Sequence, residues 1–141
     1  MIGLDTNVLV RYLAQDDPRQ SAAATNLIEA ELTVGSPGFI SLVVLAELCW
    51  VLKRLYGAAP AEIRDTVADL LSVPQLQVER RDLVQAALQR TGTGRPTKAA
   101  LVDAIITQVA LAEGCSRIMT FDRTAVRDTG MTLLTRGGTL A

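Results

Sequence analysis

The sequence predicts an α/β domain whose central, mainly parallel sheet is covered by helices on both faces. Short apolar runs alternate with helical segments along most of the 141 residues, which is the pattern of strands joined by crossover helices. Prolines at helix starts and glycines at helix ends separate these segments. We expect one domain over residues 1–135 and a flexible tail over residues 136–141.

The first half of the chain contains three of the predicted strands. MIGL is a short apolar run, and a short helix follows it directly. The next helix begins at Pro18 and has Gly35 just beyond its end, and PGFIS is the second strand. A long apolar helix ends at Gly57, another begins at Pro60, and LQVE is strand-like. In this half we predict strands at 1–4, 37–41 and 76–79, and helices at 6–15, 18–32, 42–57 and 60–73.

The second half continues the alternation. One helix has Asp82 as its cap and Gly92 as its stop, and a longer one ends at Gly114. RIMTF and MTLL then close the series as strands. Here we predict helices at 82–92 and 97–114, and strands at 117–121 and 131–134.

Composition excludes several classes of protein. The net charge is −1, so no global positive field attracts nucleic acid. The chain has no histidine, which removes Ser-His-Asp triads and His-ligated zinc. Cys49 and Cys115 have no metal-binding spacing, and we expect both to be buried thiols in a reducing compartment. We expect no signal peptide, no membrane span and a cytoplasmic location.

Two carboxylates follow strands directly. Asp5 ends the first strand and Asp122 follows RIMTF. In a parallel sheet, ligands bind beyond the carboxyl ends of the strands. Each residue could equally be a helix N-cap, because aspartate is favoured there.

Two further acids lie within apolar helices. Glu47 has Val43, Val44, Trp50 and Val51 three and four residues away, and Asp103 has equally uncharged neighbours. A carboxylate on such a face raises its pKa, finds a distant partner or coordinates a metal. A salt bridge to an arginine of another element remains the structural alternative.

Together these four acids form an oxygen-donor set, which suits Mg²⁺ or Mn²⁺ rather than zinc. A cation of this kind lowers the pKa of a bound water and neutralises charge on an attacked phosphate. A chain without histidine can therefore still hydrolyse a phosphodiester.

DTN at residues 5–7, AEL with Glu47, VDAIIT with Asp103 and TFD with Asp122 resemble the PIN-domain ribonucleases. Length and spacing are most similar to the VapC-type toxins of bacterial toxin–antitoxin pairs. The resemblance covers Ile2 to about Leu134. It implies a PIN-like three-layer α/β/α sandwich and a metal-dependent endoribonuclease that acts on RNA. It also implies a homodimer and an inhibitory antitoxin protein.

By position in these motifs, the resemblance assigns metal binding and catalysis to Asp5, Glu47, Asp103 and Asp122. Thr6, Asn7 and Thr120 match small polar positions that support such sites, and they are also ordinary capping and turn residues. Ala100 stands where many VapC-type proteins carry another acid. This difference affects the binding of a second metal ion and not the binding of the first.

Arg95 and Lys98 precede the helix that carries Asp103, where the helix dipole favours anions, and they are candidate RNA-phosphate contacts. Two alternatives remain beside the ribonuclease. One is a receiver-type signalling domain, which would need a lysine after a late strand. The other is a catalytically silent PIN-like interaction module.

Overall fold

The chain divides into two compact units in the computed structural model, which describes residues 1–91 and 100–139. Unit 1 is Met1–Arg81 and unit 2 is Asp82–Ala141. Each unit contains one three-stranded sheet.

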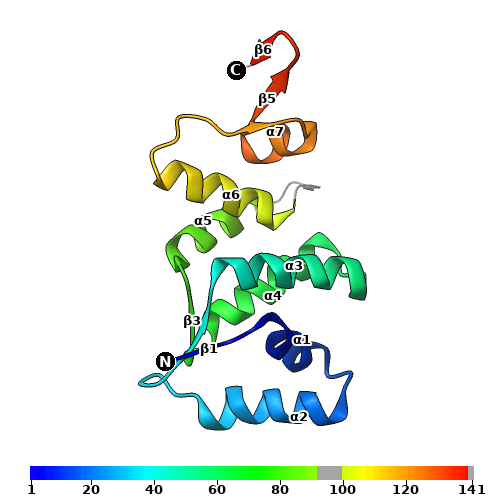
Figure 1. The fold of residues 1–141 in the computed structure, drawn as a ribbon, viewed down its shortest axis with the longest axis vertical. Coiled ribbons are helices and arrows are strands. Elements are labelled where there is room, and N and C mark those ends of the chain that lie inside the picture. Colours follow the sequence, from blue (N-terminus) through cyan, green and yellow to red (C-terminus); the bar gives the residue numbers. More distant parts are fainter. Residues whose placement is uncertain (92–99, 140–141) are drawn as a thin grey trace. The chain divides into compact units, whose positions relative to one another are not determined.

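Every predicted strand and helix has a counterpart among the described residues (Figure 1). Residue 92 of one predicted helix and residues 97–99 of the next lie outside the described residues. The prediction lacks two elements, α7 and β6. The strands are β1 (Ile2–Gly3), β2 (Gly38–Ile40), β3 (Leu76–Val78), β4 (Met119–Thr120), β5 (Thr132–Thr135) and β6 (Gly138–Thr139). The helices are α1 (Thr6–Ala14), α2 (Pro18–Asn26) with its π-helical continuation η1 (Leu27–Glu31), α3 (Leu42–Tyr56), α4 (Pro60–Ser72), α5 (Arg81–Thr91), α6 (Leu101–Ala112) and α7 (Arg123–Thr129).

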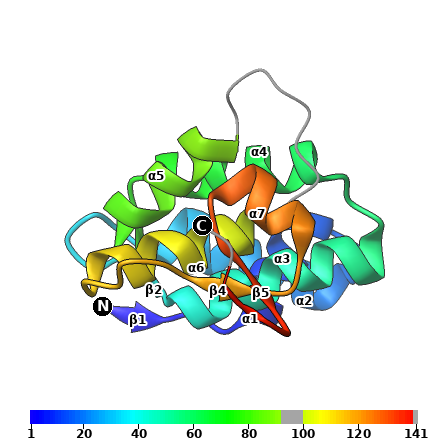
Figure 2. The ribbon, with the colours of Figure 1, turned by 90° about the horizontal axis from the view of Figure 1, so that it is seen from above.

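The sheet of unit 1 is parallel and has the order β1-β2-β3. Ile2 pairs with Gly38, and Gly38 pairs with Leu76. Figure 2 shows β1 and β2 side by side. Because the strands are parallel, the residues that follow β1, β2 and β3 all lie at one edge of this sheet. Asp5, Ser41 and Glu79 therefore share that edge.

Local signals explain where the helices of unit 1 begin and end. Asp17 accepts a hydrogen bond from the backbone N–H of Gln20 (3.0 Å), and Pro18 occupies the first turn of α2. Both features favour a helix start. Gly57 ends α3 with a φ of +65°, a conformation that glycine adopts without steric cost.

The core of unit 1 lies between these helices and the sheet. Leu9 of α1, Ile40 of β2, Leu45 and Leu48 of α3, and Val67 of α4 are all fully buried. Burying a side chain of this size contributes about 1.5–3 kcal/mol. This packing fixes α1 against α3, the two helices that carry the candidate residues of unit 1.

In unit 2, β4 and β5 are parallel, and β5 pairs with β6 in the antiparallel sense. Helix α7 packs on α6 and on both parallel strands. Asp122 caps its start, and Gly130 ends it with a φ of +78°. These two signals could have predicted α7 from the sequence. Gly138–Thr139 pairs with β5, so this part of the expected tail is a strand.

The two cysteines differ in exposure. Cys49 is buried, and burial raises the pKa of its thiol to about 11. Cys115 is exposed, so the expectation that both are buried is wrong for Cys115. Within the described ranges, no helix is long and apolar enough to cross a membrane.

Gly38 offers a direct test of the packing at the centre of this sheet. A Cβ at residue 38 would lie 2.7 Å from Leu32 Cδ1 and 2.9 Å from Leu4 Cδ1, and both leucines are buried. We expect Gly38→Ala to lower the free energy of unfolding by about 1–3 kcal/mol, the usual cost of overpacking a core.

Urea denaturation measures this change. Gly35→Ala is the matched control, because a Cβ there meets nothing within 4 Å. Equal stability of the two variants would contradict the packing around Gly38.

Candidate functional site

Asp5 lies at the carboxyl edge of the unit 1 sheet. The N–H of Leu4 donates to the carbonyl of Phe39 (2.9 Å), which continues the strand pairing up to Asp5. The backbone of Asp5 is the N-cap of α1, but its carboxylate makes no capping hydrogen bond. The side chain is exposed. The capping interpretation of Asp5 is therefore not supported, and its carboxylate makes no hydrogen bond to a described residue.

Glu47 is joined to the start of α1 by a hydrogen bond. The Thr6 hydroxyl donates to Glu47 Oε1, and Thr6 itself is only 3% exposed. This contact brings the carboxylate of α3 next to the residue that follows Asp5. The N-terminus of α1 carries partial positive charge, which stabilises nearby carboxylates. Asp5 is thus the N-cap of α1, and Glu47 is bonded to the first residue of the same helix.

The surroundings of Glu47 differ from the sequence-based expectation. Glu47 is exposed, and so are its helical neighbours Val43 (79%) and Trp50 (57%). The guanidinium of Arg54 lies 5.5 Å from the ring centre of Trp50. Among the described residues, no cation forms an ion pair with Glu47. The alternative of a structural salt bridge to Glu47 finds no support in this part of the chain.

Two residues that the sequence analysis did not single out hold the start of α3. Ser41 Oγ accepts from the N–H of Val44 (3.1 Å), and Glu79 Oε1 accepts from the N–H of Leu42 (2.8 Å). Glu79 follows β3 directly, so the rule that ligands bind beyond the carboxyl ends of parallel strands could have found it. Its carboxylate caps α3 and thereby fixes the helix that carries Glu47.

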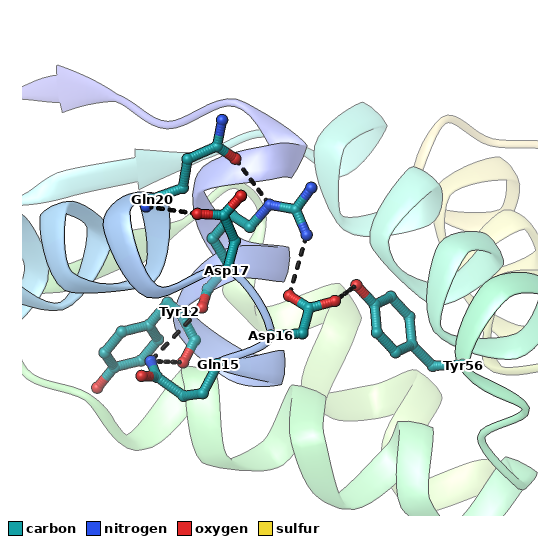
Figure 3. A network of polar contacts seen from close by, with 7 residues as sticks. Tyr12, Gln15, Asp16, Asp17, Gln20 and Tyr56 are labelled. Atoms are coloured by element: carbon teal, nitrogen blue, oxygen red, sulfur yellow. Dashed lines mark hydrogen bonds and ion pairs between the residues drawn. The ribbon is translucent and has the colours of Figure 1, made fainter.

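A polar network ties the far ends of α1 and α3 together (Figure 3). Arg11 donates to Asp16 Oδ1 (3.0 Å) and to Gln20 Oε1 (2.8 Å), and the Tyr56 hydroxyl donates to Asp16 Oδ2 (2.6 Å). The Tyr56 hydrogen bond, followed by the bond from Arg11, lowers the pKa of Asp16. Asp16 thus joins the end of α3 to the loop between α1 and α2.

In unit 2, Asp122 is the N-cap of α7. Its Oδ1 accepts from the N–H of Thr124 (2.8 Å), and its own N–H donates to Thr120 Oγ1 (3.0 Å). The capping interpretation is correct for one carboxylate oxygen of Asp122, and the side chain remains exposed. Thr120 orients the backbone of Asp122.

Asp103 lies in the first turn of α6 and is half-buried. Its carbonyl accepts from the Thr107 hydroxyl (3.0 Å), one turn further along the helix. Asp103 and Asp122 both belong to unit 2, on α6 and at the start of α7, and these two helices pack together.

The remaining predicted residues have different positions. Asn7 is exposed and lines a groove between α1 and α2 together with Arg11 and Gln20. Arg95 and Lys98 lie outside the described residues. No group of three or more acidic or cysteine side chains in the described ranges is placed to hold a metal. The four-acid cluster therefore stays a prediction.

The donors that are present fit a hard cation. Asp5 and Glu47 supply carboxylate oxygens, the ligands that Mg²⁺ prefers. Asp5 has no capping partner, and Glu47 uses one oxygen for Thr6. These two exposed carboxylates at one helix end can bind a divalent cation, with their mutual repulsion relieved on binding.

Comparison with known proteins adds the following findings. A sequence model described as the PIN domain matches residues 2–129. Among solved structures, the chain is similar to the Mycobacterium tuberculosis toxin VapC20, described as cleaving the sarcin–ricin loop. The identity is 20%, with 90% of this chain and 94% of that chain covered and a TM-score of 0.42. The comparison with curated proteins gives no match.

The Asp16 network predicts a pH-dependent stability. The pKa of Asp16 is lower in the folded state than in the unfolded state. The charged carboxylate therefore stabilises the fold fully above the unfolded-state pKa, and this contribution is lost as the pH falls through the folded-state pKa. We expect Asp16→Asn to destabilise the protein at pH 7 and to differ less from wild type at pH 3. Tyr56→Phe should show the same pH dependence, with a smaller loss of stability at pH 7.

Urea midpoints between pH 3 and pH 7 test this expectation. Asp65→Asn is the control, since Asp65 is an exposed acid of α4. A constant difference between Asp16→Asn and wild type across this range would contradict a contribution from the charged carboxylate.

Proposed function

The chain belongs to the PIN-domain family, and from this premise we propose that it is a metal-dependent endoribonuclease. It hydrolyses RNA phosphodiesters with a water activated by Mg²⁺ or Mn²⁺. The observation that carries the proposal is the pair formed at the start of α1, where the Thr6 hydroxyl holds Glu47 beside an uncapped Asp5.

The cation ligands in this proposal are Asp5 and Glu47 of unit 1 and Asp103 and Asp122 of unit 2. A bound Mg²⁺ or Mn²⁺ supplies a water of lowered pKa and neutralises charge on the phosphate. An all-oxygen donor set of this kind is typical of Mg²⁺ and Mn²⁺ rather than of zinc.

The chain's own residues orient these carboxylates. Thr6 holds one oxygen of Glu47 and leaves the other available. Ser41 and Glu79 fix the first turn of α3, and Glu47 projects from the next turn of this helix. Thr120 and the N–H of Thr124 hold Asp122 in place. Such positioning reduces the rearrangement needed when ligand binds.

The proposal includes the biological setting that the resemblance to VapC-type proteins implies. The protein is then the toxin of a toxin–antitoxin pair and acts on RNA in the cytoplasm. It forms a homodimer, and a cognate antitoxin protein holds it inactive.

The activity itself gives a direct test. Purified protein with Mg²⁺ or Mn²⁺ should cleave single-stranded or looped RNA, and EDTA should abolish the cleavage. Asp5→Asn and Glu47→Gln should each lower the rate by at least 100-fold, because each removes a charge that the cation requires. Gel analysis of labelled RNA measures these rates.

Asp65→Asn is the matched control, because it removes an exposed carboxylate of unit 1 outside the site. The fragments should carry 5′-phosphate and 3′-hydroxyl ends, since the nucleophile is water. Cleavage that persists in EDTA, or 2′,3′-cyclic phosphate ends, would contradict this chemistry. A folded protein that cleaves no RNA would instead favour the catalytically silent PIN-like module.

A further inference from the structure

Unit 2 contains a positively charged pocket that the proposed ribonuclease chemistry does not use. Its volume is about 200 Å³, and its polar lining includes Arg90 of α5, Gln108 of α6, and Ser116 and Arg117 of the loop before β4. None of the described residues that line it is acidic. Two arginines therefore give this pocket a positive charge in a chain whose net charge is −1.

The pocket lies at the opposite end of the strands from Asp122. Of its lining residues, Ile118 directly precedes β4 and Thr132 is the first residue of β5. Asp122 follows the end of β4. The pocket is therefore separate from Asp122, and on α6 its lining begins at Thr107, one turn beyond Asp103.

Arg90 is placed in this pocket by a close approach to the end of α7. Its Nη2 lies 2.7 Å from the position that a Cβ would take at Gly130. Gly130 has no side chain, so this space is open to the guanidinium. Within the described ranges, Arg90 makes no hydrogen bond or ion pair.

Other donors in the lining are also available. Ser116 is exposed, and neither its hydroxyl nor the Gln108 amide makes a hydrogen bond to a described residue. Arg117 also lines the pocket. The Arg90 guanidinium, a hydroxyl and an amide thus line one small pocket, and none of them makes a hydrogen bond to a described residue. No described lining residue is acidic, so these donors favour an oxyanion as the ligand.

We propose that this pocket binds a phosphate group, with the Arg90 guanidinium as the main contact and Ser116, Gln108 and Arg117 beside it. The planar guanidinium matches the geometry of phosphate oxygens. The volume is below that of sites for drug-sized ligands, which are about 300–1,000 Å³, so the pocket takes a phosphate group and not a whole nucleotide. The group comes from an RNA backbone or from a free phosphorylated compound.

Isothermal titration calorimetry with inorganic phosphate, at ionic strength matched with chloride, tests this proposal without relying on ribonuclease activity. We expect saturable binding to wild type and at least tenfold weaker binding to Arg90→Gln. Arg19→Gln, which removes an exposed arginine of α2, is the control and should bind as wild type does.

Ser116→Ala provides a second variant, because Ser116 is an exposed loop residue that makes no hydrogen bond to a described residue. It should weaken phosphate binding about threefold, the usual effect of one neutral hydrogen bond. If Arg90→Gln does not fold, Ser116→Ala tests phosphate binding in this pocket instead.

Fluorescence anisotropy with a short single-stranded RNA in EDTA identifies the source of the phosphate group. Weaker binding of both RNA and phosphate by Arg90→Gln assigns the pocket to the RNA backbone. Weaker binding of phosphate alone assigns it to a free phosphorylated compound.

A structural role for Arg90 at the negative end of α7 gives a different result. Arg90→Gln would then unfold at lower temperature while binding phosphate as wild type does. That outcome, or the absence of saturable phosphate binding to wild type, would overturn the proposal.

Discussion

A buried threonine hydroxyl joins the first helix of unit 1 to the third, and the arrangement of the acids in this unit depends on that bond. Thr6 is fixed by the end of β1 on one side and by the packing of α1 on α3 on the other. Its β-branched side chain has few rotamers. The hydroxyl is therefore held in one place, and it gives Glu47, an otherwise mobile exposed side chain, a defined position next to Asp5.

Other contacts in unit 1 hold α1 and α3, the helices that this bond joins. Parallel pairing of the three strands brings Asp5, Ser41 and Glu79 to one edge, and two of these three residues cap α3. At the other end of the helices, Asp16 links Arg11 of α1 with Tyr56 of α3. Helices α1 and α3 are thus joined near both ends, which limits their sliding relative to each other.

The sequence predicts most of the fold because its signals are local. Hydrophobic alternation, Pro18, Pro60 and Gly57 define elements that the structure contains, and the family match confirms the predicted PIN-like α/β fold and excludes the receiver-type alternative. Helix α7 is missing from the prediction because it has only 7 residues and carries no apolar stripe.

The site is harder to predict, because side-chain contacts depend on tertiary packing. Apolar neighbours suggest a buried environment for Glu47, but the structure leaves the acid and two of those neighbours, Val43 and Trp50, exposed. Asp5 and Asp122 follow strands in the same way, yet only Asp122 uses its carboxylate as a cap. Sequence patterns do not distinguish these two cases. Whether all four acids share one cation remains a prediction.

Thermal unfolding with and without Mn²⁺ tests most directly whether Asp5 is a cation ligand positioned beside Glu47. Bound metal stabilises the folded state by mass action, so the Tm of wild type should rise with Mn²⁺. In Asp5→Asn the rise should be smaller, and the metal-free variant should be at least as stable as wild type because like-charge repulsion is relieved. Thr6→Val, which releases Glu47, should also reduce the rise. Equal Mn²⁺-induced shifts in wild type and Asp5→Asn would contradict the account.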